Sequence, residues 1–466
     1  MWFFFGSSKP NLNSFLRPFV LSLRKIHSDG GVDWVDPATN ENRKSMVRAP
    51  FSSMDAPARS QGLNMITHGG FFACGMCLVK GVSVPTIRGH KVVYPSVLDE
   101  PFVLRTAEQM REEALQATRA HAVNGLFGPS IISYIPRFDP ARSVPNEFMH
   151  GCCLGVSKTF ASVWLTDTRG DWYIKPSISW IDEFLAAILP PDTIKRVPRS
   201  VLLWLKWKAS EWLFWLLFYS VPALLEFWTL ENKFLQHWLL FVKAIHNLLL
   251  EEIEPYHIAE ARTLLNLFLE EIRSLYRYRD PNQPAETPRN EWRWLSGDWM
   301  YTFNVHQIYH LPTVVEDTGG LWTTSAFDFE DNIEKLVNLI HGTNNIDKEL
   351  RDNLQLLESI EVLRRKVAET HPEEGPEAGK ARNHVLKVDL DGDEVQKLKL
   401  VVGDDQLTTA DLCVYSRVTF NGKVHSSRSW ERPEKRNSFT AKIKDSTGVF
   451  YGEMLYFITV GETGAS

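Results

Sequence analysis

Residues 53–77 read SMDAPARSQGLNMITHGGFFACGMC, a stretch that combines an acidic residue near its start with a pair of cysteines at its end. Cys74 and Cys77 form a Cys-x-x-Cys motif, and two thiolates three residues apart in a tight turn can bind one zinc ion. A redox-active pair and a chance pair are the alternatives. Because one such motif supplies only half of a tetrahedral site, the other ligands must come from elsewhere.

Two histidines far along the chain can supply the other half. His306 and His310 lie in NVHQIYHL (304–311), and residues four apart on a helix share one face at a separation of about 6 Å. His90 is another candidate ligand, and helical histidine pairs also occur in cores and on surfaces. The combination of one Cys-x-x-Cys with one His-x-x-x-His predicts a structural Zn²⁺ site that ties the chain near residue 75 to the chain near residue 308.

Two acidic residues flank the predicted zinc ligands. Asp55 follows a strand-like stretch at 45–51 and precedes Cys74 by 19 residues, and Glu330 follows His310 by 20 residues. If zinc joins the two segments, both carboxylates could reach one cleft and hold Mg²⁺ or Mn²⁺ for phosphoryl transfer. A chance pairing is the alternative, since the chain contains 57 Asp and Glu.

A further acid and histidine lie three residues apart. Glu147 and His150 belong to NEFMHGCCLGV (146–156). On a helix they could share a metal ion or a hydrogen bond. The alternative is a helix start at which Glu147 occupies the capping region.

Between these motifs the sequence predicts a large helical block. Apolar residues recur at helical spacing between 148 and 280, and 13 of the 16 Trp lie between Trp164 and Trp322, which favours an aromatic core over a base-stacking surface. The apolar stretch 201–228 has no uncharged run longer than 14 residues, whereas a spanning helix needs about 20. We therefore expect buried helices there and no membrane partner.

Outside this block the pattern changes along the chain. Helices are expected at 13–26, 100–124, 299–312, 328–341 and 346–368, and an acidic Pro- and Gly-containing linker follows them. Alternating runs at 385–390, 398–402 and 451–460 predict strands of a small β-domain.

Length and composition are those of an intracellular globular protein. The 466 residues, 44% apolar and 23% charged, suffice for several domains, and five Cys exclude a disulfide scaffold. The net charge of −6 is split, with 22 Lys and Arg against 17 Asp and Glu in 1–200 and 29 against 40 in 201–466. Separate surfaces or plain solubility would each explain this split. It shows no cluster of basic residues for strong DNA binding.

Taken in order, the motifs resemble those of DDE transposases of the CACTA (EnSpm-like) group and, more distantly, Transib-type transposases and the V(D)J recombinase. The likeness runs collinearly from about Lys9 to Asn344. The segments that carry it, besides 53–77, 146–156 and 304–311, are NGLFGPSII (124–132), WKASEWLFWLLFYSVPALL (207–225) and GGLWTTSAFDFEDN (319–332).

The resemblance implies an α+β fold with a partial RNase H-like core, interrupted by a large Trp-rich helical insertion and followed by a small C-terminal β-domain. It assigns Asp55 and Glu330 as the second and third catalytic acids. It also assigns the Cys2His2 set as zinc ligands and Glu147 and His150 as possible metal-binding or orienting residues. The implied parts are the partial core (1–147), the insertion (148–298), core-closing helices (299–368), a linker (369–380) and the β-domain (381–466).

Two departures from the family pattern set the functional expectation. The family has Asp where this chain has Glu147, and its first catalytic Asp lies upstream of the block that begins here near Lys9. Asp29, Asp33 and Asp36 lie in a loop context that does not match it. We therefore expect a transposon-derived, nuclear protein that lacks its N-terminal part, is inactive in this form, contacts DNA weakly or indirectly and could form a homo-oligomer.

Two other functions are compatible with the sequence. A non-enzymatic protein-binding or scaffold protein would use the Trp-rich block and the β-domain for contacts with partners. A zinc hydrolase would need an open position on the metal, which four protein ligands would not leave.

Overall fold

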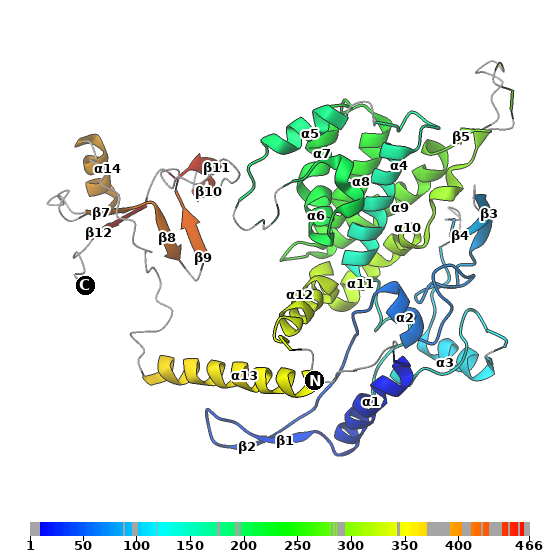
Figure 1. Ribbon diagram of the computed structural model, residues 1–466, viewed down its shortest axis with the longest axis horizontal. Helices are drawn as coiled ribbons and strands as arrows, with labels where there is room; N and C mark the ends of the chain where they lie inside the picture. The colour runs from blue at the N-terminus through cyan, green and yellow to red at the C-terminus, as the bar shows by residue number, and fades with distance from the viewer. Residues whose placement is uncertain are drawn as a thin grey trace. The chain divides into compact units, whose positions relative to one another are not determined.

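The computed structural model of the chain (Figure 1) falls into two compact units. It describes residues 10–86, 89–95, 101–118, 120–174, 178–191, 194, 196, 198–280, 283–284, 286, 294–342, 345–370, 392–402, 412–420, 423–427, 440–445, 448–454 and 457–460. The core unit comprises Met1–Leu185 and Ser200–Ile333, and the C-terminal unit comprises Ala186–Arg199 and Glu334–Ser466. All candidate site residues named above lie in the core unit.

The first part of the core unit alternates short helices with hairpins. Its elements are α1 (Leu12–Ser28), β1 (Val32–Val35), β2 (Asn42–Ser45), α2 (Ala56–Gly62), β3 (Val82–Thr86), β4 (Gly89–Val93), α3 (Ala107–Gln116) and η1 (Ile131–Tyr134), where η marks a 3-10 or π helix. The helix expected at 13–26 is confirmed as α1, which Asn11 caps by accepting a hydrogen bond from the Ser14 amide at 3.1 Å. The helix expected at 100–124 is shorter than predicted.

The strand predicted at 45–51 is wrong. Strand β2 ends at Ser45, and residues 46–55 have no regular secondary structure. Pro50 lacks the amide that a strand interior would use. Asp55 instead forms the N-cap of α2, where its carboxylate accepts a hydrogen bond from the Ala58 amide at 2.7 Å. A short acidic side chain before a proline in the first turn favours such a helix start.

The middle of the core unit is the expected helical block. It contains η2 (Met149–Ser157, a π helix), α4 (Lys158–Thr166), α5 (Ile178–Ala187), η4 (Val201–Lys206), α6 (Ala209–Phe214), η5 (Trp215–Tyr219), α7 (Ser220–Leu225), α8 (Lys233–Leu248) and α9 (Pro255–Leu275). Figure 1 shows most of these helices packed in one bundle. Its centre is aromatic, since Trp164 and Trp238 are almost fully buried with ring centroids 5.1 Å apart. The predicted aromatic core is confirmed.

The last part of the core unit leads to the histidine segment. Its elements are β5 (Tyr278–Arg279), β6 (Trp294–Leu295), η7 (Gly297–Met300), α10 (Phe303–Gln307), η8 (Ile308–His310), α11 (Leu311–Thr318), η9 (Leu321–Thr324) and α12 (Ala326–Val337). Gly155 of η2 lets α10 approach closely, because a Cβ there would lie 2.6 Å from Asn304 Nδ2. This approach places 146–156 against 304–311.

The C-terminal unit contains helices and short strands. They are α13 (Ile346–Thr370), α14 (Gly392–Val402), β7 (Leu412–Tyr415), β8 (Arg417–Phe420), β9 (Lys423–Ser426), β10 (Thr440–Asp445), β11 (Gly448–Glu453) and β12 (Phe457–Val460). Strand β7 is paired to the distant β12. The strand predicted at 398–402 is wrong, because these residues end helix α14. The strand predicted at 385–390 and most of the 369–380 linker lie outside the described residues. The strand predicted at 451–460 falls on β11 and β12.

The sheets are small. Every sheet within the described ranges consists of two antiparallel strands. The fold is therefore mixed helix and strand, as α+β implies, and the RNase H-like core stays a prediction. Among the described helices, none has both the length and the apolar character needed to cross a bilayer.

Candidate functional site

The two cysteines lie in a turn that a buried arginine holds. Arg105 Nε donates to the carbonyl oxygens of Cys74 at 2.9 Å and Cys77 at 3.2 Å. Its Nη2 donates to the carbonyl oxygens of Phe72 at 3.1 Å and Asn124 at 2.7 Å. One guanidinium thus satisfies four carbonyl groups, and it fixes the direction in which both thiols point.

His306 lies in the last turn of α10, and His310 is the last residue of η8, which follows α10 directly. Thr302 caps α10, since its side-chain oxygen accepts a hydrogen bond from the Val305 amide at 3.4 Å. His306 and His310 are buried and their ring centroids lie 5.2 Å apart. Phe102 packs edge-on against His306 at a centroid distance of 4.8 Å. The aromatic contact restricts the rotation of the ring.

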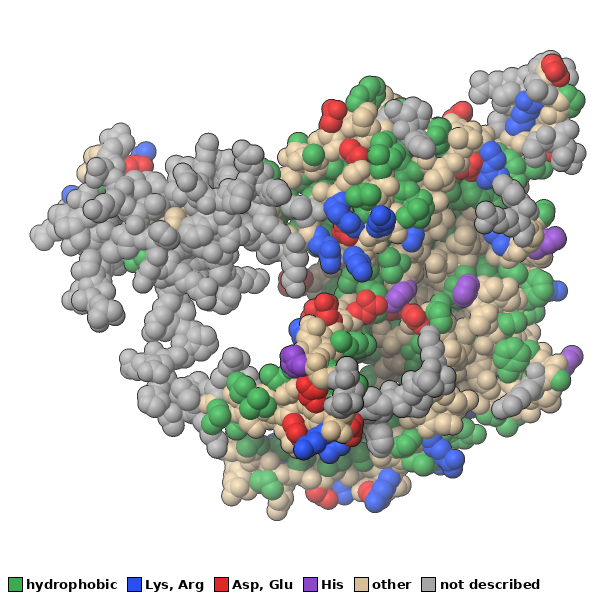
Figure 2. Space-filling view, viewed as in Figure 1, with side chains coloured by type: hydrophobic (Ala, Val, Ile, Leu, Met, Phe, Trp, Pro, Cys, Tyr) green, Lys and Arg blue, Asp and Glu red, His purple; other side chains and the backbone are tan. Residues whose placement is uncertain are grey.

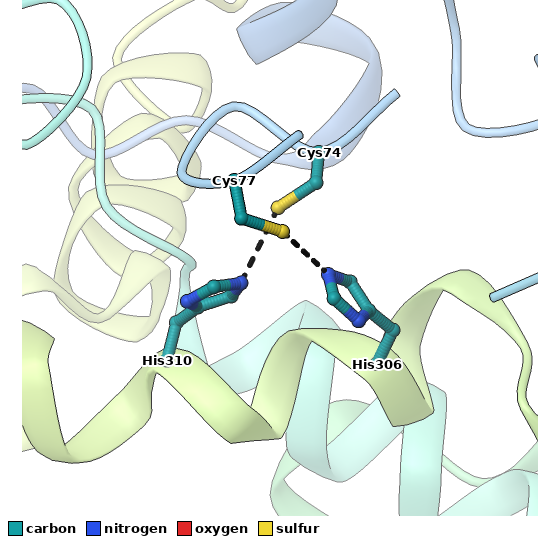
Figure 3. A group of neighbouring side chains, drawn as sticks. All are labelled: Cys74, Cys77, His306 and His310. Carbon is teal, nitrogen blue, oxygen red and sulfur yellow. Dashed lines mark hydrogen bonds between the residues drawn. The ribbon is translucent and has the colours of Figure 1, made fainter. Parts of the chain in front are cut away.

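The four side chains converge on one point (Figure 3). Cys74 Sγ lies 3.5 Å from His310 Nε2, Cys77 Sγ lies 3.3 Å from His306 Nε2, and all four ligand atoms lie within 4.8 Å of one another. Ligands of a tetrahedral zinc ion with ordinary bond lengths lie about 3.3–3.8 Å apart. The set therefore fits a zinc ion and can hold a metal. It is the only such group within the described ranges.

The two thiols differ in the direction of their pKa shifts, because their neighbours act on them differently. Burial disfavours the Cys74 thiolate, but the hydrogen bond from Cys77 and the charges of His310 and His306 hold the pKa of Cys74 well below its ordinary value. Burial and the neighbouring Cys74 raise the pKa of Cys77. Burial also lowers the pKa of His306, which keeps the imidazole neutral as a metal ligand requires.

The alternative ligand His90 is not part of this group. It lies on β4, where it is paired with Pro85 of β3 and exposed. The Cys-x-x-Cys with His-x-x-x-His interpretation therefore describes the centre, and the interpretation with His90 is wrong.

A buried polar network leads from the four candidate metal ligands, which we call the metal centre (Cys74, Cys77, His306 and His310), towards the acidic residues. Gln307 Nε2 donates to Cys74 Sγ at 3.3 Å, and Gln307 Oε1 accepts from Arg59 Nη2 at 2.9 Å. Arg59 Nη1 donates to Asn146 Oδ1, and Asn146 Nδ2 donates to the Gln307 carbonyl at 3.2 Å. Arg59, Gln307 and Asn146 are all buried. The network ends beside Glu147, the next residue along the chain.

Glu147 has every acceptor position of its carboxylate occupied. Oε1 accepts from the amides of Met149 at 2.6 Å and Ala326 at 2.7 Å, and Oε2 accepts from the His150 amide at 2.8 Å and lies 2.7 Å from His150 Nδ1. A carboxylate has about four acceptor sites. Burial would raise the pKa of Glu147, but the hydrogen bonds from His150, Ala326 and Met149 lower it. These contacts agree with the helix-start and the hydrogen-bond interpretations of the pair, and a shared metal ion stays a prediction.

His150 presents its second nitrogen to another carboxylate. Its Nε2 lies 3.6 Å from Glu330 Oε1 on α12, with the His150 side chain 33% exposed and the Glu330 side chain 57% exposed. The hydrogen bond to Glu147 raises the pKa of His150, and the charges of Glu147, Glu330 and Asp55 raise it further. Figure 2 shows acidic and histidine side chains close together on the face that is viewed.

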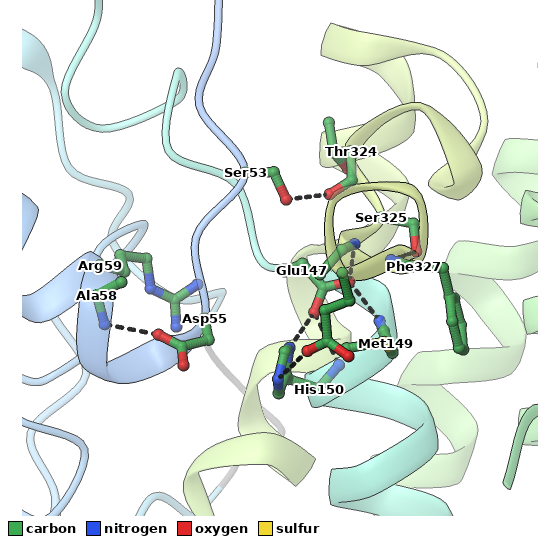
Figure 4. A network of polar contacts seen from close by, with 12 residues as sticks. Ser53, Asp55, Ala58, Arg59, Glu147, Met149, His150, Thr324, Ser325 and Phe327 are labelled. Carbon is green, nitrogen blue, oxygen red and sulfur yellow. Dashed lines mark hydrogen bonds and ion pairs between the residues drawn. The ribbon is translucent and has the colours of Figure 1, made fainter. Parts of the chain in front are cut away.

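Asp55 reaches the same region from α2 (Figure 4). Asp55 Oδ1 accepts a hydrogen bond from the Ala58 amide. The negative charge of Asp55 favours the protonated forms of both His150 and Arg59. Ser53 donates to the Thr324 carbonyl at 2.6 Å and joins the segment before α2 to the segment before α12. The candidates thus share one region. Asp55, Glu147, His150 and Glu330 do not form a closely spaced set of metal ligands. Within the described part of the chain, only the Cys2His2 group forms such a set.

Four residues of this arrangement were not expected from the sequence. They are buried polar residues that link or shape the site, namely Arg59, Asn146, Gln307 and Arg105. Gln307 directly follows His306 in the sequence. Arg59 follows Asp55 by one helical turn. Once the motifs are known, these positions next to motif residues could have indicated both side chains. Arg105 has no such signal, because its partners are backbone carbonyls.

Comparison with known proteins leaves the chain without an assigned family. No family model, no curated protein and no solved structure matches it.

Proposed function

We propose that the chain derives from a DDE transposase of the CACTA group and retains a structural zinc centre beside a carboxylate site that is not assembled for strand cleavage. The observation that carries this proposal is the convergence of motifs from distant segments. Cys74 and Cys77, His306 and His310, and Glu147 with His150 are joined through one buried network. The order of these motifs is the order that the transposase resemblance implies.

The zinc ion would serve the fold and not the chemistry. Cys74, Cys77, His306 and His310 would fill all four positions of a tetrahedral ion, whereas catalytic zinc keeps one position open. This donor set therefore disfavours the zinc hydrolase alternative. When bound, the ion would fix the Cys turn to the α10 segment and, through Gln307, support Arg59. Arg59 lies next to the acidic region, by which we mean Asp55, Glu147, His150 and Glu330.

The acidic region would hold a divalent cation loosely. Asp55 and Glu330 are the candidate ligands for Mg²⁺ or Mn²⁺, while Glu147 is fully occupied by hydrogen bonds and acts on His150 as an orienting group. Two-metal phosphoryl transfer needs carboxylates that bridge ions about 3.5–4 Å apart. Two carboxylates, one of them shared with a helix cap, are too few to organise such a pair.

Manganese titration tests this site. We expect the full chain to bind Mn²⁺, and Asp55→Asn and Glu330→Gln each to weaken binding about tenfold, the loss of one charged ligand. Asn is itself a good N-cap, so Asp55→Asn preserves α2. Asp328→Asn is the matched control, because it removes the same charge from an exposed position on α12. Equal binding by all four proteins would contradict the assignment.

A cleavage assay tests the second half of the proposal. We expect no cutting or joining of duplex DNA by the full chain with Mg²⁺ or Mn²⁺. The proposed loss of activity would be overturned if the full chain cleaved DNA, if Asp55→Asn and Glu330→Gln each abolished the cleavage, and if Asp328→Asn retained it. Such a result would show a complete active site.

The proposed partner is DNA in the nucleus, with weak contact because the chain has a net charge of −6. Binding should be measurable only at low salt and should fall steeply as salt rises. Nuclear exclusion of a fluorescent fusion of the full chain would contradict this placement.

A scaffold function is the second candidate, and exposed apolar side chains favour it. Asp182 of α5 accepts hydrogen bonds from Ser200 Oγ at 2.5 Å and the Val201 amide at 2.7 Å, which joins α5 to η4. These two segments expose Trp180 by 58% and Leu205 by 66%. Sedimentation of the full chain and of Trp180→Ser/Leu205→Ser tests self-association. A monomer in both proteins would remove this support.

A further inference from the structure

A hollow of about 760 Å³ lies in the core unit and shares no lining residue with the metal centre or the acidic region. Strand β4, the end of α4, the loop after α4, strand β5 and helix η7 all contribute to it. The lining residues that matter here are Lys91, Thr166, Asp167, Arg169, Tyr278 and Trp299. The volume falls in the range of about 300–1,000 Å³ that small-molecule sites occupy.

Arg169 is held rigidly in the wall of this hollow. Its Nε and Nη2 donate to Asp167 Oδ1 at 2.8 Å and Oδ2 at 2.7 Å. The guanidinium carbon lies 4.1 Å from the ring centroid of Tyr278 and 4.8 Å from that of Trp299. Stacking and a two-point ion pair fix a side chain that is normally mobile. The hollow thus contains a preorganised planar cation.

Lys91 adds a second positive charge. Its Nζ donates to the Trp299 carbonyl at 2.8 Å and lies 5.5 Å from the Trp299 ring centroid. No carboxylate of the described residues forms an ion pair with Lys91. Burial lowers the pKa of Lys91, and the charge of Arg169 lowers it further. The hollow therefore contains two cations and one carboxylate, Asp167, which pairs with Arg169 alone. An anion in the hollow would relieve the repulsion between Lys91 and Arg169.

The basic lining continues past the loop after α4. A second hollow of about 500 Å³ shares Thr168 and Arg169 with the first. Lys233, Arg277 and Arg279 also line it, together with the acidic Asp171. The two hollows thus flank one loop, and basic side chains outnumber acidic ones along both.

We propose that the first hollow binds a nucleoside phosphate, with the phosphate beside Lys91 and Arg169 and the base along Tyr278 and Trp299. Cationic groups recognise phosphate through charge-assisted hydrogen bonds, and aromatic side chains offer surfaces on which any base can pack. Ser162 also lines the hollow and carries a hydroxyl group, whereas the Thr166 hydroxyl donates to the Ser162 carbonyl at 2.7 Å. The ligand could be a free nucleotide or one unit of a single strand, and the chemistry of recognition is the same.

Titration of the full chain with ADP, adenosine, inorganic phosphate and a single-stranded oligonucleotide tests the proposal. We expect ADP to bind and adenosine to bind at least tenfold more weakly. Lys91→Gln should weaken ADP binding about tenfold, the effect of one charged hydrogen-bond donor. Lys243→Gln is the matched control, because Lys243 is a partly exposed lysine on α8 that pairs with Glu260. It should leave ADP binding unchanged.

Arg169→Lys provides a second variant, since it keeps the charge and removes the planar fork. Its near-ultraviolet circular dichroism and that of Lys91→Gln should match the unmodified chain, and whichever variant remains folded decides the outcome. A strand that binds more tightly than ADP identifies nucleic acid as the source, and the reverse order identifies a free nucleotide. Glu330→Gln changes only the acidic region and should leave ADP binding unchanged. The proposal on the acidic region and the proposal on this hollow can therefore fail independently.

Three results would overturn the proposal. They are no binding of ADP or of the oligonucleotide at millimolar concentration, adenosine binding as tightly as ADP, and unchanged ADP affinity in the folded variants of Lys91 and Arg169.

Discussion

The metal centre and the acidic region are both built from segments far apart in the sequence, yet they differ in how completely the fold organises them. The four metal ligands are buried, and their ligand atoms lie within 4.8 Å of one another. In the acidic region Glu330 is 57% exposed and His150 is 33% exposed. A donor set that is buried and mutually close is ready for an ion, whereas exposed carboxylates need an ion or a substrate to draw them together.

Removal of one metal ligand should have the largest effect. Cys77→Ser would abolish zinc binding and lower the free energy of unfolding by about 5 kcal/mol or more, because structural zinc contributes its binding energy to folding. Urea denaturation and zinc analysis measure both quantities. Cys152→Ser, which changes another buried thiol outside the centre, should retain zinc. Full zinc content in Cys77→Ser would contradict the assignment.

The network between the two regions should have the next largest effect. Arg59→Met would lower the free energy of unfolding by about 2–4 kcal/mol, because Asn146 and Gln307 would lose buried hydrogen bonds. Zinc should remain, since no ligand changes. Arg142→Met, which breaks an exposed pair with Asp317, should cost less than about 1 kcal/mol. If the two variants were equally stable, Arg59 would not join the regions.

The pair of Glu147 and His150 should make stability depend on pH. The pKa of His150 is raised, so its contribution is full below the unfolded value of 6.5 and is lost as pH rises through the folded value. The pKa of Glu147 is lowered, so its contribution is full above 4.5 and is lost as pH falls through the folded value. The pair therefore stabilises most between these two values.

Urea denaturation of the unmodified chain and of His150→Asn, from pH 5 to 9, measures this dependence. The stability difference between the two proteins should shrink as pH rises above 6.5. Taking the difference removes the pH dependence of the metal centre, which both proteins share. A difference that stays constant across the range would argue against the pair.

The smallest effect on stability is expected at the exposed end of the acidic region. Glu330→Gln should change the free energy of unfolding by less than about 0.5 kcal/mol, as for most surface substitutions. A loss of 2 kcal/mol or more, an order of effect typical of buried groups, would mean that Glu330 is part of the organised network. The comparison between the two regions would then fail.

The sequence was sufficient to predict the Cys2His2 group because the spacing rules of its two halves are local. Cys74 and Cys77 share a turn and His306 and His310 share a helix face whatever the rest of the fold does. The convergence of two such pairs is then the simplest way to complete four ligands. Helix α1 and the aromatic core followed from equally local patterns.

Other parts could not be read in this way. Asp55 was expected after a strand and caps a helix instead, although Asp before Ala56 and Pro57 was a helix-start signal. Residues 398–402 alternate like a strand but continue a helix, because a short apolar run is compatible with both. The role of Arg105 could not be predicted from the sequence, because its partners are carbonyl groups that only the folded chain brings together.

X-ray absorption spectroscopy at the zinc edge on the purified full chain tests the central claim most directly. We expect one zinc ion per chain with two sulfur neighbours at about 2.3 Å and two imidazole nitrogens at about 2.0–2.1 Å. A folded chain that holds no zinc, or zinc surrounded by oxygen ligands, would contradict it.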